Sequence, residues 1–484
     1  SSLRQLGRLG ITLGGDMSNQ KKPVQRSFDR SIVEGPIAGA VWKLAWPTML
    51  QNVIGGLQGI VDHAMVGHFV GFTGNAAIGV AWQIFLVVIV FITSLFTGMG
   101  VLVARFAGAD DPEKVNRTVY QAFLTAAGLS LGILAPIGYV FGPALLGLVN
   151  AAPEVQTEAL PYLRIMFTFS LGMLMFFMLG GALRAAGDAK TPLKLGMALT
   201  IMNVVLNLIF IPIFGTKGAA IGTTLAGGLL GVYTAWRLLS GKWVIRFHRG
   251  MNWKPDWKII RALFKFGVPT GIQGVAMNIG GVVVLGFVGS LAQSAAAQAA
   301  YTVSYTQLFS LITWTSVGLM GATGAVTGQN LGAGKPERSI HAVHVASFIG
   351  LGVALTVGAI FRLFPEALFA FFGLDEPDVV ELGIQLLAYL SVSGFFITVA
   401  LAYTGALQGT GDTKSPLYIS LVSQVLLPIG LLTFLSATRE LQPAHVWTAI
   451  LLGHITRAGL SVFRFRQGEW RHIEVKIDDA TEQT

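Results

Sequence analysis

Apolar residues dominate long stretches of the chain, and short polar segments rich in glycine and proline separate these stretches. A membrane-spanning helix needs about 20 mainly apolar residues to cross a hydrocarbon core of about 30 Å. The pattern therefore predicts an all-α polytopic membrane protein with twelve transmembrane helices. The predicted spans lie near residues 37–66, 76–104, 118–148, 159–185, 192–214, 219–239, 262–289, 296–327, 341–372, 382–407, 416–436 and 445–463.

Composition supports the membrane class. Of the 484 residues, 53% are hydrophobic and only 12% are charged, whereas about 25% of the residues of a soluble domain are charged. The chain has no cysteine, which excludes disulfides, thiolate metal sites and a cysteine nucleophile. We expect no enzyme activity and no cofactor, because the sequence shows no metal-ligand cluster, no nucleophile–base pair and no phosphate-binding loop.

Lysine and arginine gather in alternate loops between the predicted spans. They occur at 105–117, 184–194, 237–265 and 329–338, whereas the loop at 289–295 has neither. Cytoplasmic loops carry the excess of these residues, so we predict an inner (plasma) membrane protein with both termini in the cytoplasm. The net charge of +9 is then a sign of topology, and we expect no nucleic-acid partner.

A duplication is visible in the polar loops. Gly187-Asp188-Ala189-Lys190-Thr191-Pro192 returns 224 positions later as Gly411-Asp412-Thr413-Lys414-Ser415-Pro416. Pro47 and Pro269, which should bend the first helix of each half, match at an offset of 222. Because each half has an even number of spans, the halves should form two pseudo-symmetric six-helix bundles in a parallel repeat, with the substrate path between them.

We therefore expect five regions along the chain. The first 16 residues of the N-terminal tail are expected to precede the natural start at Met17. The regions are an N-terminal tail (1–34), an N-lobe (35–240), a cytoplasmic linker (241–257), a C-lobe (258–466) and a cytoplasmic C-terminal tail (467–484).

Over residues 35–465 the chain resembles the multidrug and toxic compound extrusion (MATE) family. The resemblance depends on Leu44-Ala45-Trp46-Pro47-Thr48, on Val61-Asp62-His63-Ala64-Met65-Val66-Gly67, and on the duplicated Gly-Asp loops. It implies a secondary active efflux antiporter that exchanges organic compounds, cationic and lipophilic in character, for H⁺ or Na⁺ by alternating access of two lobes. It also implies that one chain is sufficient for function, with small molecules and membrane lipids as its partners.

The resemblance is strongest to the DinF-like (DNA-damage-inducible) branch and implies an ion-coupling site. That branch carries a carboxylate fifteen residues after the proline of helix one, as Asp62 does here. Its Asn–Asp pair on helix five corresponds to Asn203 and Asn207, so the second acid is an amide here, and its helix-six threonine falls at Thr223 or Thr224. A single carboxylate favours H⁺ as the coupling ion, and the alternative is a Na⁺ site at Asp62, Asn203, Asn207 and Thr223.

The residues themselves also single out Asp62. A carboxylate inside an apolar span is costly and usually functional, and burial favours its protonated form. Gln51, Gln58 and Asp62 are seven and four residues apart, so they share one helix face. The alternative interpretation is an outer-end carboxylate that only meets interfacial water. For Asn203 and Asn207 the alternative interpretation is a structural one, in which hydrogen bonds between helices only hold the bundle together.

Candidate substrate contacts include polar and aromatic residues of both halves. Aromatic rings can bind organic cations by cation–π contact, although such residues more often pack or lie at the membrane interface. The candidates are Gln58, Asn278, Gln298, Tyr301 and Tyr305.

One alternative function stays open, a flippase for lipids or lipid-linked saccharides in the same superfamily. A lumen that meets pyrophosphate needs basic residues, whereas here nearly all of them lie in the predicted cytoplasmic loops.

Overall fold

The computed structural model describes residues 28–148, 153–475 and 477, and every regular element in them is helical. Most of the N-terminal tail (1–27) and the last residues of the C-terminal tail lie outside this part of the chain. The elements of the first half are α1 (Ser31–Glu34), α2 (Ile37–Phe69), α3 (Phe72–Gly108), α4 (Pro112–Leu129), η1 (Ser130–Leu134), α5 (Ala135–Leu148), α6 (Pro153–Thr168), α7 (Leu171–Ala185), α8 (Lys190–Phe214) and α9 (Thr216–Leu239).

The second half repeats this order after a connection of 17 residues, 240–256. Its elements are α10 (Trp257–Gly289), α11 (Ser294–Tyr301), η2 (Thr302–Leu308), α12 (Ser310–Gly332), α13 (Pro336–Leu363), α14 (Pro365–Phe371), α15 (Pro377–Thr410), α16 (Lys414–Ser420), η3 (Leu421–Leu426), α17 (Leu427–Thr438), α18 (Pro443–Arg466) and η4 (Glu469–His472). Segments η1, η2 and η3 are short π-helical turns inside longer helices.

The predicted spans correspond to these helices, with two interruptions, one between α6 and α7 within the span predicted at 159–185 and one at the end of α13. The span predicted at 341–372 is interrupted at Phe364, and a separate short helix, α14, begins at Pro365. A proline disfavours helical backbone in the residue before it, and Phe364 has φ −131° and ψ 38°. The span therefore ends at Leu363, earlier than predicted.

Most of these helices are apolar enough to cross a membrane. In the described residues ten segments meet this test by length and composition, and α6 with α7, bent by 52°, makes an eleventh. Helix α2, the first predicted span, does not meet the same test. Its 33 residues extend about 50 Å, well over the thickness of a bilayer core. It is less apolar because Gln51, Gln58 and Asp62 interrupt it, and these side chains face a protein cavity described below.

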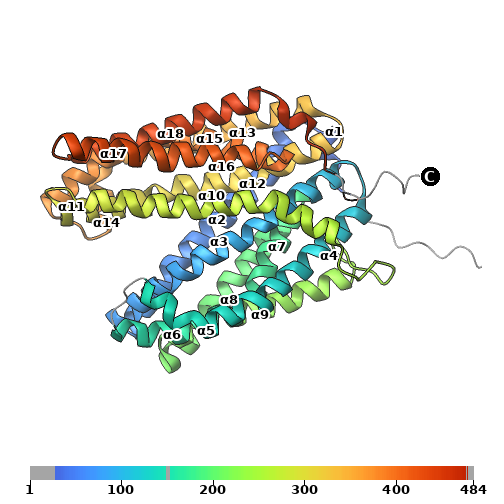
Figure 1. The fold of residues 1–484 in the computed structure, drawn as a ribbon, viewed down its shortest axis with the longest axis horizontal. Helices are drawn as coiled ribbons and strands as arrows, with labels where there is room; N and C mark the ends of the chain where they lie inside the picture. Colours follow the sequence, from blue (N-terminus) through green and yellow to red (C-terminus); the bar gives the residue numbers. More distant parts are fainter. Residues whose placement is uncertain (1–27, 149–152, 476, 478–484) are drawn as a thin grey trace, which may run out of the picture.

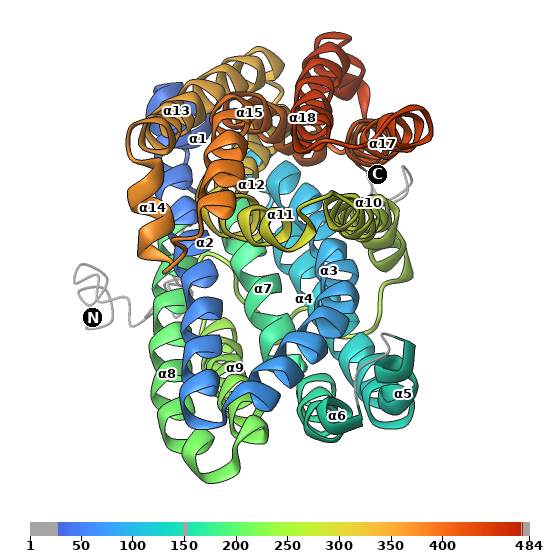
Figure 2. The ribbon, with the colours of Figure 1, turned by 90° about the vertical axis from the view of Figure 1, so that its left-hand side faces the viewer.

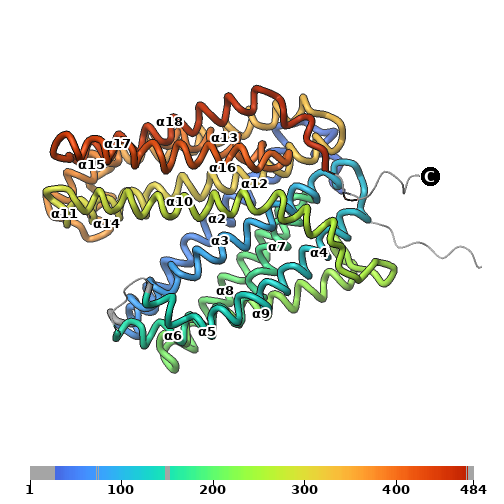
Figure 3. The backbone as a smooth tube through the Cα atoms, in the orientation of Figure 1, coloured from blue at the N-terminus to red at the C-terminus, as the bar shows by residue number. Residues whose placement is uncertain are grey.

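The helices form two groups that lie closer together at one end than at the other (Figure 1). In a view from the open end, α5, α6, α8 and α9 lie in the lower group and α13, α14, α17 and α18 in the upper group (Figure 2). Two long pairs join the groups, because α2 packs against α12 and α3 packs against α10. The chain path places the connection between α9 and α10 at the converging end (Figure 3).

Reciprocal glycine contacts show the parallel repeat at the crossing of α3 and α12. A Cβ atom on Gly108 would lie 2.0 Å from the carbonyl oxygen of Gln329, and one on Gly332 would lie 2.1 Å from that of Arg105. The two contacts are equivalent, because Gly108 matches Gly332 and Arg105 matches Gln329 at the offset of 224 that the polar loops show. The two bundles therefore meet about a pseudo-two-fold axis, as predicted, and bare backbone is what permits this close approach.

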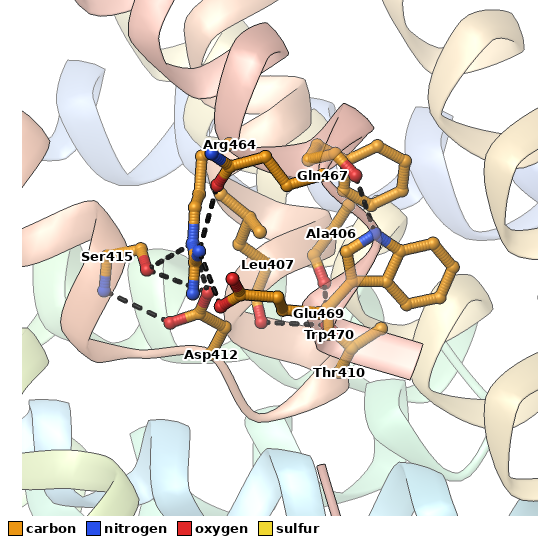
Figure 4. A network of polar contacts seen from close by, with 10 residues as sticks. Ala406, Leu407, Thr410, Asp412, Ser415, Arg464, Gln467, Glu469 and Trp470 are labelled. Atoms are coloured by element: carbon orange, nitrogen blue, oxygen red, sulfur yellow. Dashed lines mark hydrogen bonds and ion pairs between the residues drawn. The ribbon is translucent and has the colours of Figure 1, made fainter. Parts of the chain in front are cut away.

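The duplicated Gly-Asp loops are turns that lead into α8 and α16. The Asp188 carboxylate accepts hydrogen bonds from the backbone N–H (2.9 Å) and hydroxyl (2.5 Å) of Thr191. Asp412 accepts the equivalent bonds from Ser415, at 3.1 Å and 2.7 Å. Asp412 is also ion-paired with Arg464, 3.1 Å away, in the network of the second loop (Figure 4).

The connection between the bundles is fixed to α4. Buried Phe247 stacks edge-on against Tyr120, and the Tyr120 hydroxyl donates to the carbonyl of Trp253 (2.9 Å). The Gln121 amide donates to the carbonyl of Lys254 and accepts from the N–H of Asp256. The linker predicted at 241–257 thus packs on the first bundle. The limits assigned to the lobes and tails stay a prediction.

The α3–α12 crossing yields a stability prediction. We expect Gly332→Ala to lower the free energy of unfolding by about 1–3 kcal/mol, because the added methyl group collides with backbone. Gly352 in α13 is the matched control, since a Cβ there meets no atom within 4 Å, and Gly352→Ala should be neutral or slightly stabilising. Thermal unfolding followed by tryptophan fluorescence compares the two variants; equal effects would contradict the close-contact account.

Candidate functional site

A cavity of about 480 Å³ lies inside the first bundle. Helices α2, α3, α6, α7, α8 and α9 form its wall, and Trp314 of α12 contributes the one lining residue from the second half within the described chain. The Trp314 ring packs so closely on α2 that a Cβ at Gly56 would lie 2.5 Å from it. The cavity is therefore enclosed at one point by the opposite bundle.

The polar face predicted for α2 lines this cavity. Gln51, Gln58 and Asp62 are all among the lining residues. The Thr200 hydroxyl of α8 donates to Gln58 Oε1 at 2.8 Å. Asp62 is the one acid that lines the cavity in the part of the chain that the structure describes. The polar residues of α2 thus point into protein and away from lipid.

The four residues predicted as the ion site form one hydrogen-bonded chain. Asn207 Nδ2 donates to Asp62 Oδ1 (3.0 Å) and, less well, to Asn203 Oδ1 (3.4 Å). Asn203 Nδ2 donates to Thr223 Oγ1 (3.0 Å). Asn203 and Asn207 are buried, and their i,i+4 spacing on α8 places both amides on the face toward α9 and α2. The structure thus brings the predicted residues together.

Of the two threonines considered, Thr223 is the one in this chain of contacts. The Thr224 hydroxyl donates to the carbonyl of Ala220 (2.7 Å), which is a local bond within α9. Thr223 also donates to its own helix, at Ala219 O (2.9 Å). The hydroxyl proton of Thr223 is therefore directed to Ala219, and its oxygen accepts the hydrogen bond from Asn203.

One acceptor in the site is unsatisfied. Among the described residues, Asn207 Oδ1 is buried and has no hydrogen-bond donor. Gly222 of α9 faces it so closely that a Cβ would lie 2.0 Å from this oxygen. A buried acceptor without a donor is unfavourable, and a proton or a cation would satisfy it.

The donor set limits what the site can hold. Its oxygens are one carboxylate, two amide carbonyls and one hydroxyl, and hard cations bind such oxygens. In the described residues no group of three or more His, Cys, Asp or Glu side chains could hold a metal ion. The arrangement therefore suits a proton on Asp62, or a monovalent cation shared with the amide oxygens.

Aromatic residues complete the cavity, and the sequence did not single them out. They are Trp82 of α3, Tyr162 of α6, Phe176 and Phe177 of α7, and Trp314 of α12. In an apolar helix such residues look the same whether they pack in a core or line a cavity.

The candidates from the second half lie elsewhere. Tyr301 and Tyr305 stack 5.0 Å apart, and the column continues to Trp447 on one side and Phe309 on the other. Asn278 and Gln298 make only local bonds, to Gly274 O and Ser294 Oγ. None of these four candidates lines the cavity that contains Asp62, so their contact with a substrate stays a prediction.

The model of the MatE family matches residues 47–209 and 269–432, one match in each half. A probable multidrug resistance protein NorM of Thermotoga maritima is 26% identical over 440 residues, covering 88% of this chain and 92% of its own. The multidrug resistance protein MdtK of Pectobacterium atrosepticum is 26% identical over 437 residues, covering 87% and 94%.

Solved structures share the fold at lower identity. A multidrug resistance MATE family transporter of the MOP superfamily, described as outward-facing, superposes with a TM-score of 0.84 at 21% identity, over 92% of this chain and 98% of its own. A MOP superfamily transporter from Pyrococcus furiosus, described as having a binding pocket of reverse polarity that suggests a different function, gives the same values.

The Asn207 environment yields a prediction for Gly222. We expect Gly222→Ala to lower the free energy of unfolding by about 1–3 kcal/mol, because the methyl group displaces the Asn207 amide from Asp62. Gly228→Ala on the same helix is the control, since a Cβ there meets no atom within 4 Å. Thermal unfolding of the purified variants is the measurement. A Gly222→Ala protein as stable as the control would contradict the claim that Gly222 leaves room for the Asn207 amide.

Proposed function

Because the chain belongs to the MatE family of transporters, we propose that it is a secondary active antiporter that exports organic compounds in exchange for H⁺ or Na⁺. One observation supports this best: the only acid among the described lining residues, Asp62, is hydrogen-bonded to the buried amide of Asn207 and also faces a cavity large enough for a small organic molecule. The names of the relatives, multidrug resistance proteins, agree with the export of drugs.

We favour H⁺ as the coupling ion. A lone carboxylate in a largely apolar cavity loses the favourable hydration of its charge, and protonation removes that cost. A protonated Asp62 would donate to an acceptor such as the unsatisfied Asn207 Oδ1. Sodium is the alternative, with Asp62, Asn203, Asn207 and Thr223 as its oxygen ligands.

The walls of the cavity support lipophilic cations as substrates. Trp82, Tyr162 and Trp314 offer aromatic faces beside the one carboxylate, and aromatic faces attract cations by about 0.5–2 kcal/mol each. A substrate cation and the coupling ion would then compete for the charge of Asp62. Exchange follows from that competition, because binding of one favours release of the other.

Loop charges support an orientation in the plasma membrane with both termini cytoplasmic. The lysine- and arginine-rich connections, such as 184–194 and 329–338, lie where α7 meets α8 and where α12 meets α13. These connections, like the one between α9 and α10, belong to the converging end of the bundles (Figure 3). By the positive-inside rule, the end where the lobes diverge faces outward, and alternating access would move the N-lobe (35–240) against the C-lobe (258–466).

Two finer assignments belong to the same proposal. The Asp62 position fifteen residues after Pro47 favours the DinF-like branch. The site residues described above all come from one chain, with Trp314 supplied by the opposite bundle, so a monomer would be sufficient for transport.

Transport in liposomes tests the proposal. We expect the reconstituted protein to move a fluorescent lipophilic cation when a pH gradient is imposed, and Asp62→Asn to reduce this movement to the background of empty liposomes. Asn keeps the size of Asp62 but cannot exchange a proton. Glu154→Gln, which removes an exposed acid of α6, is the control and should transport like the wild type.

The result also separates the alternatives. Transport that follows an imposed Na⁺ gradient and does not respond to a pH gradient would identify Na⁺ as the coupling ion, bound at the same residues. Full activity in Asp62→Asn would contradict the coupling role of Asp62. No cation transport under either gradient would contradict the antiporter and favour a flippase for lipids or lipid-linked saccharides.

A further inference from the structure

A second cavity, of about 370 Å³, lies between the two bundles. Residues of α2, α3 and α7 line one side, and residues of α12 and α15 line the other. Because these helices include the pair α3 and α12 that crosses at the pseudo-two-fold axis, we refer to this space as the central cavity.

The central cavity follows the internal symmetry except in its charge. Gly100 and Gly324 both line it and are 224 positions apart, as are Gly181 and Gly405. Arg184 and Gln408 also line the cavity at equivalent positions, 224 apart, but they differ in residue type. The duplication thus carries a cation in the first half where the second half has a neutral amide.

Arg184 has no partner in the described part of the chain. It lies at the end of α7 and is partly buried, and no hydrogen bond or ion pair joins its guanidinium to a described residue. Its Nε lies 3.4 Å from where a Cβ of Gly321 would be, so the group rests against bare backbone of α12. Arg464, by contrast, is paired with Asp412 and Glu469.

The lining of the central cavity offers Arg184 no counter-charge. No Asp or Glu is among the described residues that line it, and its polar members are neutral, such as Thr48, Asn52 and Gln408. A cation that is removed from water without a counter-ion is strongly unfavourable. A guanidinium also presents N–H donors in a fork that matches two oxygens of one anion.

We propose that the central cavity is a binding site for an anionic group, a carboxylate or a phosphate, held by Arg184. The ligand class is an amphiphile with an aromatic or acyl body, because Phe96, Phe177 and Val317 supply apolar walls beside the cation. The anion would come either from a carboxylate on a transported compound or from the phosphate of a lipid headgroup.

This site is chemically the opposite of the cavity at Asp62, yet the two adjoin. Asn52 and Phe177 line both. Along α2, Asn52 is ten residues from Asp62, or about 15 Å, so one helix supplies residues to the walls of both cavities. The inference therefore goes beyond the proposed export of cations and does not depend on ion coupling.

Equilibrium binding without any gradient tests the proposal, so that its outcome is independent of transport. The purified protein is placed in phosphatidylcholine nanodiscs and titrated with dansylglycine, an anion, and with dansylamide, a neutral probe with the same fluorophore. We expect the wild type to bind dansylglycine at least about tenfold more tightly than dansylamide, the size of one charge-assisted hydrogen bond. Arg184→Gln should abolish that preference, and Arg184→Lys should keep part of it.

Two controls separate binding from folding. Arg164→Gln removes another arginine of the first bundle, one that stacks on Tyr139 and lines neither cavity, and should keep the preference. Because Arg184 has no partner among the described residues, Arg184→Gln should unfold at the temperature of the wild type or above it. A preference for dansylglycine that persists in a folded Arg184→Gln protein would overturn the proposal, as would its absence from the wild type.

The lipid composition identifies the source of the anion. In nanodiscs that contain phosphatidylglycerol, weaker dansylglycine binding in the wild type but not in Arg184→Gln would assign the site to a lipid phosphate. Unchanged binding would assign it to carboxylates of transported compounds.

Discussion

The carboxyl group of Asp62 sets the strongest constraint on this structure. It lies in a helix that has to cross a membrane, where a charge is costly and a polar group needs a partner inside the protein. The partner is Asn207, 3.0 Å away on α8. That contact in turn requires α9 to approach α8 with a glycine, because any Cβ at Gly222 would occupy the place of the Asn207 oxygen. Three helices are thus arranged around one side chain.

The duplication determines how the two bundles meet. The two halves touch through reciprocal glycine contacts at the crossing of α3 and α12, and through the long pairs α2 with α12 and α3 with α10. A buried apolar cluster that includes Leu44 of α2 and Leu319 of α12 also lies where the two halves meet. The chemistry is less symmetric than the fold, since Asp62 and Arg184 both belong to the first half.

The sequence predicted the parts of the structure that depend on polar residues in an apolar chain. The parallel repeat and the meeting of Asp62, Asn203, Asn207 and Thr223 follow from such positions, and the contacts are in the structure. Two features were not predicted. Tyr162 and Trp314 line a cavity, but their residue types are also those of ordinary packing. Arg184 was counted among the loop cations, because a cation at the end of a helix looks cytoplasmic until the second bundle covers it.

The central claim is that the state of Asp62 governs the arrangement of the two bundles, and a distance measurement tests it most directly. Since the chain has no cysteine, spin labels on Thr157→Cys and Thr438→Cys, at exposed positions of α6 and α17, report the spacing of the bundles. The account predicts that the distance distribution of the wild type in nanodiscs shifts between acidic and alkaline pH, or with Na⁺, and that Asp62→Asn stays in one state. An equal shift in Asp62→Asn would contradict it.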